Sequence, residues 1–178
     1  MSKQYIITDP CYILSDTVWQ NICKSCKDDD YYNGTFDNKV TEELNKLANT
    51  TTAKASTTGF GDWQNCIHSD NPTEANIIQS DFFADSGMVC VVEYNDIIKQ
   101  ALKDKNNDHL TDENTGSAAV IEIQDDSDID IEMDTSDTNW TQVKISTPNE
   151  NFWSTYPYND DDEEEDEDYC DYDPEDDE

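Results

Sequence analysis

The residues best suited to chemistry in this sequence are carboxylates that alternate with apolar side chains. Residues 128–134 read Asp-Ile-Asp-Ile-Glu-Met-Asp, which predicts a strand with one carboxylate face and one apolar face. Alternate residues on such a face are about 6.6–6.8 Å apart, close to two phosphate rises of ~3.4 Å along one DNA strand. The pattern predicts either an imitation of a phosphate track or the solvated face of an edge hairpin, where charge blocks aggregation.

Two further groups of acidic residues extend this charge. Segments 118–123 and 129–133 flank a short polar stretch, which predicts a hairpin with a second row of carboxylates beside the first. Residues 160–168 form an unbroken acidic run in a tail that we expect to be disordered when free and to enter a cationic groove on binding. The residues predicted to contact a partner are Glu122, Asp125, Asp126, Asp128, Asp130, Glu132, Asp134, Asp160, Asp161, Asp162, Glu163, Glu164, Glu165 and Asp166.

Four residues have the types and approximate spacing of a zinc site, namely Cys23, Cys26, Cys66 and His68. The first two fall on the apolar face of a predicted helix, where free cysteine is an ordinary core residue. The pattern therefore favours core thiols over zinc, and we expect no metal or other cofactor. Neither His68 nor His109 belongs to a recognisable nucleophile motif, which indicates a protein that is not an enzyme.

The charge of the whole chain restricts its partners. The sequence contains 43 Asp and Glu residues, 10 Lys and no Arg, for a formal net charge of −33. Fifteen of the acidic residues lie in 160–178, so the rest of the chain is strongly acidic as well. Repulsion excludes bare nucleic acid and anionic membranes as direct partners and favours a basic, nucleic-acid-binding protein.

Neither a signal-peptide core nor an apolar run of about 18 residues is present, which predicts a cytoplasmic location, in the host cytoplasm if the chain is phage-encoded. In that compartment the six cysteines are expected to be reduced.

Periodicity predicts the elements that must position these groups. Apolar residues at helical spacing predict helices over 16–27, 38–48 and 96–103, and shorter apolar or alternating runs predict strands over 5–7, 88–94, 118–123, 129–133 and 140–145. We expect a short strand near 35–36, a strand or loop at 49–58, and a central position in the sheet for 88–94. The prediction is an α+β fold, with a small antiparallel sheet and two or three short helices in residues 1–149, followed by an acidic tail over 150–178.

Three short motifs carry a family resemblance. Asp9-Pro10-Cys11-Tyr12 follows the first predicted strand, Gly59-Phe60-Gly61-Asp62 lies midway, and Asp85-Ser86-Gly87 opens the strand at 88–94. With Trp19 on a helix, these motifs resemble a set of small bacterial and phage proteins that have an N-terminal DPCY and a downstream DSG motif. The resemblance covers about the first hundred residues. It implies a compact, sheet-rich domain. From their own residue types, Asp9-Pro10 and Asp85-Ser86-Gly87 predict turns at strand ends, not catalysis.

In charge and size the chain also resembles the acidic proteins with which phages imitate DNA. The leading hypothesis is an inhibitor that blocks the cationic groove of a host DNA- or RNA-binding defence protein, such as a restriction or CRISPR enzyme. One alternative is an interaction protein or chaperone whose acidic tail binds a basic partner. Another is a divalent-metal-binding protein. The oligomeric state stays open.

Overall fold

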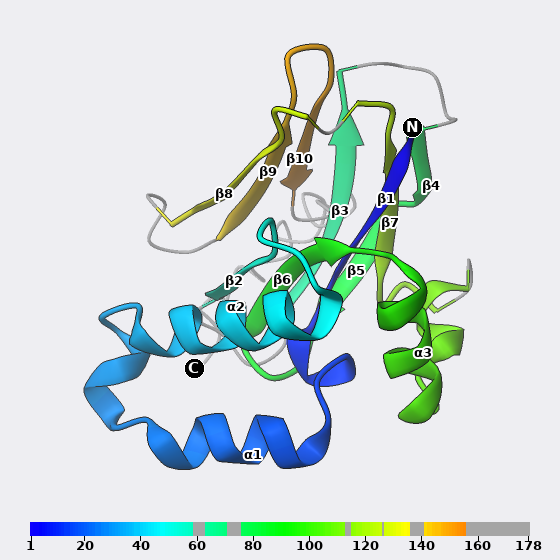
Figure 1. Cartoon of the computed structure of the whole chain (residues 1–178). Helices are drawn as coiled ribbons and strands as arrows, with labels where there is room; N and C mark the ends of the chain where they lie inside the picture. Colours follow the sequence, from blue (N-terminus) through cyan, green and yellow to red (C-terminus); the bar gives the residue numbers. More distant parts are fainter. Residues whose placement is uncertain (59–62, 71–75, 113–114, 126, 136–140, 156–178) are drawn as a thin grey trace, which may run out of the picture.

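A computed structural model describes residues 1–58, 63–70, 76–112, 115–125, 127–135 and 141–155 of the chain (Figure 1). Within these residues, three α-helices and two five-stranded antiparallel sheets form three layers, in the order helices, sheet A, sheet B. The predicted α+β class is confirmed, although there are two sheets where one was expected. The expected disorder of the tail concerns residues outside the described ranges.

Sheet A is the central layer, and both of its faces are buried. β1 shows how one strand serves two cores: Tyr5 and Ile7 face sheet B, whereas Ile6 faces the helices. The strands, in spatial order and all antiparallel to their neighbours, are β2 (Lys54–Thr57), β6 (Met88–Glu93), β1 (Lys3–Thr8), β7 (Ala119–Ile123) and β4 (Ile77–Gln79).

Sheet B packs one face against sheet A through Ile67, Phe82, Ile145 and Phe152, all nearly inaccessible to solvent. Its other face is turned away from sheet A, and no helix of the described residues lies over it. Its strands, in spatial order, are β5 (Asp81–Ala84), β3 (Trp63–Ser69), β10 (Asn151–Thr155), β9 (Gln142–Ser146) and β8 (Asp130–Asp134).

The three helices cover the face of sheet A that is turned away from sheet B. Phe36 lies at the centre of the contact between the first two, in edge-to-face contact with Trp19 and stacked on Tyr31, at centroid distances of 5.9 and 4.5 Å. Ser15 caps the first helix and Asn95 caps the third, each accepting hydrogen bonds from backbone N–H groups. The helices are α1 (Asp16–Ser25), α2 (Thr35–Ala48) and α3 (Asp96–Asp104).

The free edge of sheet A at β2 is closed by side chains of α2. Asp37, Thr41 and Asn45 accept hydrogen bonds of 2.9–3.0 Å from alternate backbone N–H groups of segment 53–57. Four residues of helix rise about 6 Å and two residues of strand about 6.6–6.8 Å, so the two repeats match. The helix therefore takes the place of a neighbouring strand and protects the edge from unwanted pairing.

The Asp-Pro-Cys-Tyr and Asp-Ser-Gly motifs meet at one buried carboxylate. Asp9 is inaccessible to solvent, and its two oxygens accept four hydrogen bonds of 2.6–2.8 Å from Cys11 N, Asp85 N, Ser86 N and Ser86 Oγ. The predicted turns at the ends of β1 and β5 are present, and Asp9 fastens them together. Burial first, and then the nearby charge of Asp9, raises the pKa of Cys11 and Cys90, so both thiols stay protonated.

Three predictions about the elements are wrong. Segments 118–123 and 129–133 do not form a hairpin, because β7 pairs with β1 and β4 in sheet A while β8 pairs with β9 in sheet B. Residues 35–36 begin α2 and are not a strand. The folded part also passes the predicted boundary at 149, because residues 151–155 form β10 inside sheet B.

Candidate partner-binding face

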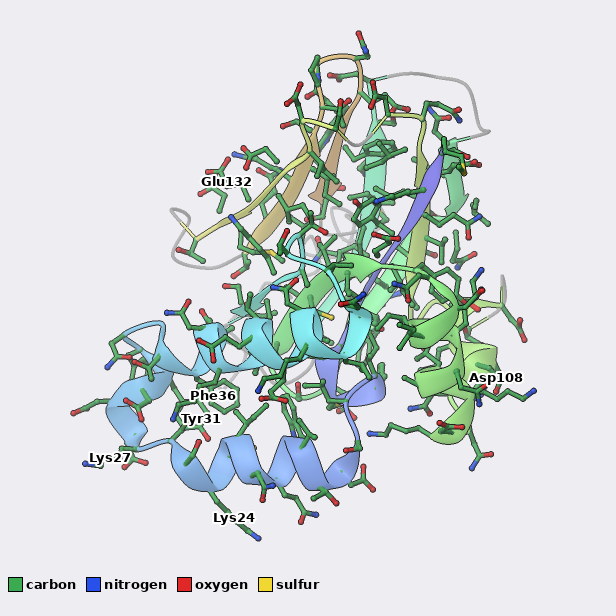
Figure 2. All side chains as sticks on the ribbon, viewed as in Figure 1. Lys24, Lys27, Tyr31, Phe36, Asp108 and Glu132 are labelled. Carbon is green, nitrogen blue, oxygen red and sulfur yellow. The ribbon has the colours of Figure 1, made fainter. Side chains whose placement is uncertain are left out.

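Positive charge is concentrated in the helix layer. Only Lys144 lies in a strand of sheet B, whereas Lys3 and Lys54 belong to sheet A. Figure 2 shows Glu132 of β8 at the opposite end of the molecule from Lys24 and Lys27. The lysines are thus unevenly distributed between the layers, while carboxylates occur in both, including Asp37, Glu42 and Glu43 on α2. The seven lysines in or directly beside the helices are Lys24, Lys27, Lys39, Lys46, Lys99, Lys103 and Lys105.

The acidic row of β8 forms one edge of sheet B, as its alternation predicted. Asp130 and Glu132 are exposed, and Ile131 between them is buried against sheet A. Asp134 accepts a 2.6 Å ion-paired hydrogen bond from Lys144 on β9, and this bond is the first cause of the raised pKa of Lys144. Lys144 thus offsets the charge of Asp134, while Asp130 and Glu132 face the solvent.

A cross-strand row runs inward from this edge over four strands. Glu132 lies opposite Lys144, Lys144 opposite Trp153, and Trp153 opposite His68. The Trp153 and His68 rings stack with centroids 6.0 Å apart at an interplanar angle of 29°. We name this surface the open face; its residues are Asp130, Glu132, Asp134, Gln142, Lys144, Ser146, Trp153, Thr155, Cys66 and His68.

An aromatic centre beside a charged edge is typical of protein-binding surfaces, where Trp is over-represented among the residues that contribute most affinity. The chain leaves the described residues at Thr155, the end of β10, which lies in the middle of sheet B. The segment that contains the acidic run therefore starts from the same sheet as the β8 row.

A compact polar cluster lies next to Trp153. The Nε2 atom of His68 is 2.6 Å from Thr155 Oγ1 and 3.3 Å from Cys66 Sγ, and Cys66 Sγ is 3.6 Å from Thr155 Oγ1. Cys66 is half-buried and His68 is exposed. The cluster unites a thiol, an imidazole and a hydroxyl on one accessible surface.

The four residues considered for zinc do not come together. Cys23 and Cys26 belong to α1 and its C-terminus in the helix layer, whereas Cys66 and His68 lie on β3 with all of sheet A between. No three or more His, Cys, Asp or Glu side chains of the described residues are grouped as metal ligands. The cysteine pair on α1 packs against the helix core, as the apolar face predicted.

The predicted second row of carboxylates is not beside the first. Glu122 lies on β7 of sheet A, opposite Gln4, while Asp125 is exposed in the connection to β8. Asp125 accepts a 3.1 Å hydrogen bond from the backbone of Ser127, which lowers its pKa. Asp128 is exposed directly before the β8 row. Asp126 and the predicted contacts Asp160, Asp161, Asp162, Glu163, Glu164, Glu165 and Asp166 lie outside the described residues.

The centre of the open face was missed from the sequence. Trp153 and Thr155 belong to β10, in which Phe152 and Ser154 point inward. The sequence offers only a weak signal, the aromatic pair Phe152-Trp153, because Asn-Phe-Trp-Ser-Thr does not alternate apolar and polar residues and lies within the predicted tail. The sequence singles out His68 as a possible zinc ligand and places it in no nucleophile motif, and neither pattern indicates that it lies beside Trp153.

None of the family models, curated proteins or solved structures compared with this chain matches it. In the described residues, no helix combines the length and the apolar character required to cross a membrane. What the chain does must be inferred from its own residues.

Proposed function

We propose that the chain is a non-enzymatic inhibitor that imitates nucleic acid and occupies the cationic groove of a DNA- or RNA-binding defence protein. The observation that supports this most is the uneven distribution of the lysines. Sheet B carries exposed carboxylates along β8 and only one lysine, while seven of the ten lysines lie in or beside the helices. A net charge of −33 opposes folding by self-repulsion, and a cationic partner would relieve that cost.

The open face suggests how such a partner would be held. Asp130 and Glu132 present carboxylates along one edge, at a spacing of about 6.6–6.8 Å that lysines and arginines of a phosphate-binding groove can match, and Asp128 is exposed in the turn before them. Trp153, two strands inward and beyond Lys144, supplies an apolar anchor. The contact differs from the two-row track expected from the sequence, because the neighbour of β8 among the described strands is β9, which carries Lys144 and no carboxylate.

Charge pairing of this kind predicts binding that weakens with salt. The dependence should be less steep than for DNA, because a row of carboxylates does not release a condensed counterion atmosphere as duplex DNA does.

A second function has one observation in its favour. Fifteen of the 43 acidic residues lie in 160–178, a concentration that would suit a tail serving a basic client, with the folded part as a separate scaffold. In that case the tail alone would bind the partner, and the open face would be dispensable.

Capture from a bacterial lysate tests the proposal. The immobilised full chain is incubated at roughly 50 and 200 mM salt, and captured proteins are then challenged with double-stranded DNA. We expect a basic nucleic-acid-binding protein that is retained at low salt and displaced by DNA. Partners that DNA does not displace, or that a 156–178 peptide captures equally well, would refute the imitation of nucleic acid and favour the tail-based function.

A further inference from the structure

The polar cluster of the open face has a chemistry that charge recognition does not use. His68 Nε2 lies within hydrogen-bonding distance of Thr155 Oγ1, at 2.6 Å, and of Cys66 Sγ, at 3.3 Å. Both neighbours carry a proton that they can donate. A neutral imidazole with its proton on Nδ1 presents one lone pair on Nε2, which accepts a proton from either neighbour in turn. The Cys66 thiol also lies 3.5 Å from Thr155 O, to which it can donate when Nε2 accepts from Thr155.

The position of the imidazole is fixed from two sides. Trp153 stacks on the ring at 6.0 Å, and Thr155 contacts Nε2 from the neighbouring strand, β10. Cys66 and His68 are two residues apart on β3, so their side chains project from the same face of the sheet. A base held beside a thiol on an accessible surface is the arrangement that activates cysteine for nucleophilic attack.

The other described thiols provide a contrast. Burial raises the pKa of Cys11, Cys23 and Cys90, and Cys90 is completely buried. Cys26 is half-buried, as Cys66 is, but its contact is the Ser25 hydroxyl at 4.0 Å and not an imidazole. Cys26 is therefore an internal reference for a partly accessible thiol without a base.

We propose that Cys66 is a nucleophilic thiol whose proton is accepted by His68, and that it takes small disulfides as electrophiles. Nε2 accepts the thiol proton as Sγ attacks one sulfur of the disulfide. A new S–S bond to Cys66 forms while the original S–S bond breaks, and the departing thiolate takes the proton from His68. Electrons and protons balance, because the disulfide is reduced to one thiol and one mixed disulfide.

The surrounding charge selects among disulfides. The chain carries a formal net charge of −33, which disfavours the approach of an anionic electrophile. Neutral or cationic disulfides should therefore react faster than acidic ones. This inference is independent of the identity of any protein partner.

The test measures modification rates of single cysteines in the full chain. All proteins carry Cys23→Ser, so that no thiol next to Cys26 can resolve an adduct formed there. The probe is 2-hydroxyethyl disulfide, which is neutral, and adducts are assigned to each cysteine by peptide mass spectrometry. We expect Cys66 to react at least about a hundredfold faster than Cys26, the lower end of the range for a positioned general base.

The His68→Gln variant distinguishes the effect of the imidazole base on the Cys66 rate from the effect of solvent accessibility. It should reduce the Cys66 rate to about that of Cys26 and leave the Cys26 rate unchanged, while thermal unfolding confirms that the exposed substitution keeps the fold. Equal rates at Cys66 and Cys26 in the parent chain would overturn the proposal without any variant. An unchanged Cys66 rate in a folded His68→Gln chain would overturn it as well.

Discussion

Asp9 and Ser86 are joined by two hydrogen bonds, from Ser86 N to Oδ2 at 2.6 Å and from Ser86 Oγ to Oδ1 at 2.7 Å. The pair connects the end of β1 with the turn between β5 and β6, and so ties together two motifs far apart in the sequence. Since β5 belongs to sheet B and β6 to sheet A, this contact holds the two sheets at one corner.

Substitutions at this pair should therefore destabilise the fold to different degrees. Asp9→Asn puts an NH2 group where a carboxylate oxygen accepts, so N–H groups in partly buried hydrogen bonds lose their acceptor, at a cost of about 3 kcal/mol. Ser86→Ala removes one donor and leaves the others in place, at a cost of about 1 kcal/mol. Urea unfolding of both variants checks this order, and a cost for Asp9→Asn no greater than that for Ser86→Ala would contradict it.

Truncation distinguishes the folded domain from the tail. A chain ending at residue 155 keeps β10 and should unfold cooperatively at a temperature close to that of the full chain. A chain ending at 149 loses a strand from the interior of sheet B, together with Phe152, and should not fold. Circular dichroism and thermal melts measure both; cooperative unfolding of the shorter chain would show that β10 is dispensable.

The 1–155 chain should also bind the partner, more weakly than the full chain.

Partial burial of the Asp37 carboxyl predicts a specific effect of pH on the stability of the fold. Burial raises its pKa above the ordinary 3.8, while the hydrogen bond from Thr57 N opposes this. The folded chain thus holds the proton more tightly than the unfolded chain. The stabilisation that comes from this tighter proton binding is fully present below the ordinary pKa of the carboxyl. It is lost as the pH rises through the raised pKa of the folded chain. Asp37→Asn keeps an acceptor for Thr57 and does not ionise.

The stability of Asp37→Asn relative to the parent should accordingly increase as the pH rises from below the ordinary pKa of 3.8 through the raised folded pKa, and then level off. Asp29→Asn is the control, since it removes the same charge from an exposed position. Urea unfolding across this range measures both. If the two variants gain the same free energy of unfolding at every pH, only the general charge repulsion has changed, and the burial of Asp37 has no specific effect.

The helices could be predicted from the sequence because their signals are local. Apolar residues at helical spacing and the caps Ser15 and Asn95 locate α1 and α3, and α2 differs only by starting three residues earlier than expected. β1, β6, β7 and β8 follow from apolar runs or strict alternation. β3 was missed because Asn65, a buried polar residue on its inner side, interrupts the apolar alternation.

The open face could not be predicted, because it depends on the register of strands distant in sequence. A short polar segment between two strands predicts a hairpin, and nothing local shows that β7 pairs with β1 while β8 crosses to sheet B. The acidic row itself followed from alternation. Its neighbours Trp153 and His68 follow only from the pairing of β10 with β3 and β9.

We expect the position of the carboxylates, and not merely their number, to determine binding. Two triple variants remove the same three charges: Asp128→Asn, Asp130→Asn and Glu132→Gln beside the open face, or Asp28→Asn, Asp29→Asn and Asp108→Asn on the helix side. Asp134 is left intact because it holds Lys144. All six positions are exposed, and Figure 2 shows Asp108 and Glu132 on different parts of the surface.

The decisive measurement is the affinity of both triple variants, relative to the parent chain, for the basic protein captured from the lysate. Three exposed charge contacts of about 0.5–1 kcal/mol each predict at least a roughly tenfold loss for the open-face variant. The helix-side variant should stay within about twofold of the parent, since more distant exposed charges are screened. Equal losses in the two variants, or no loss at the open face, would contradict the account.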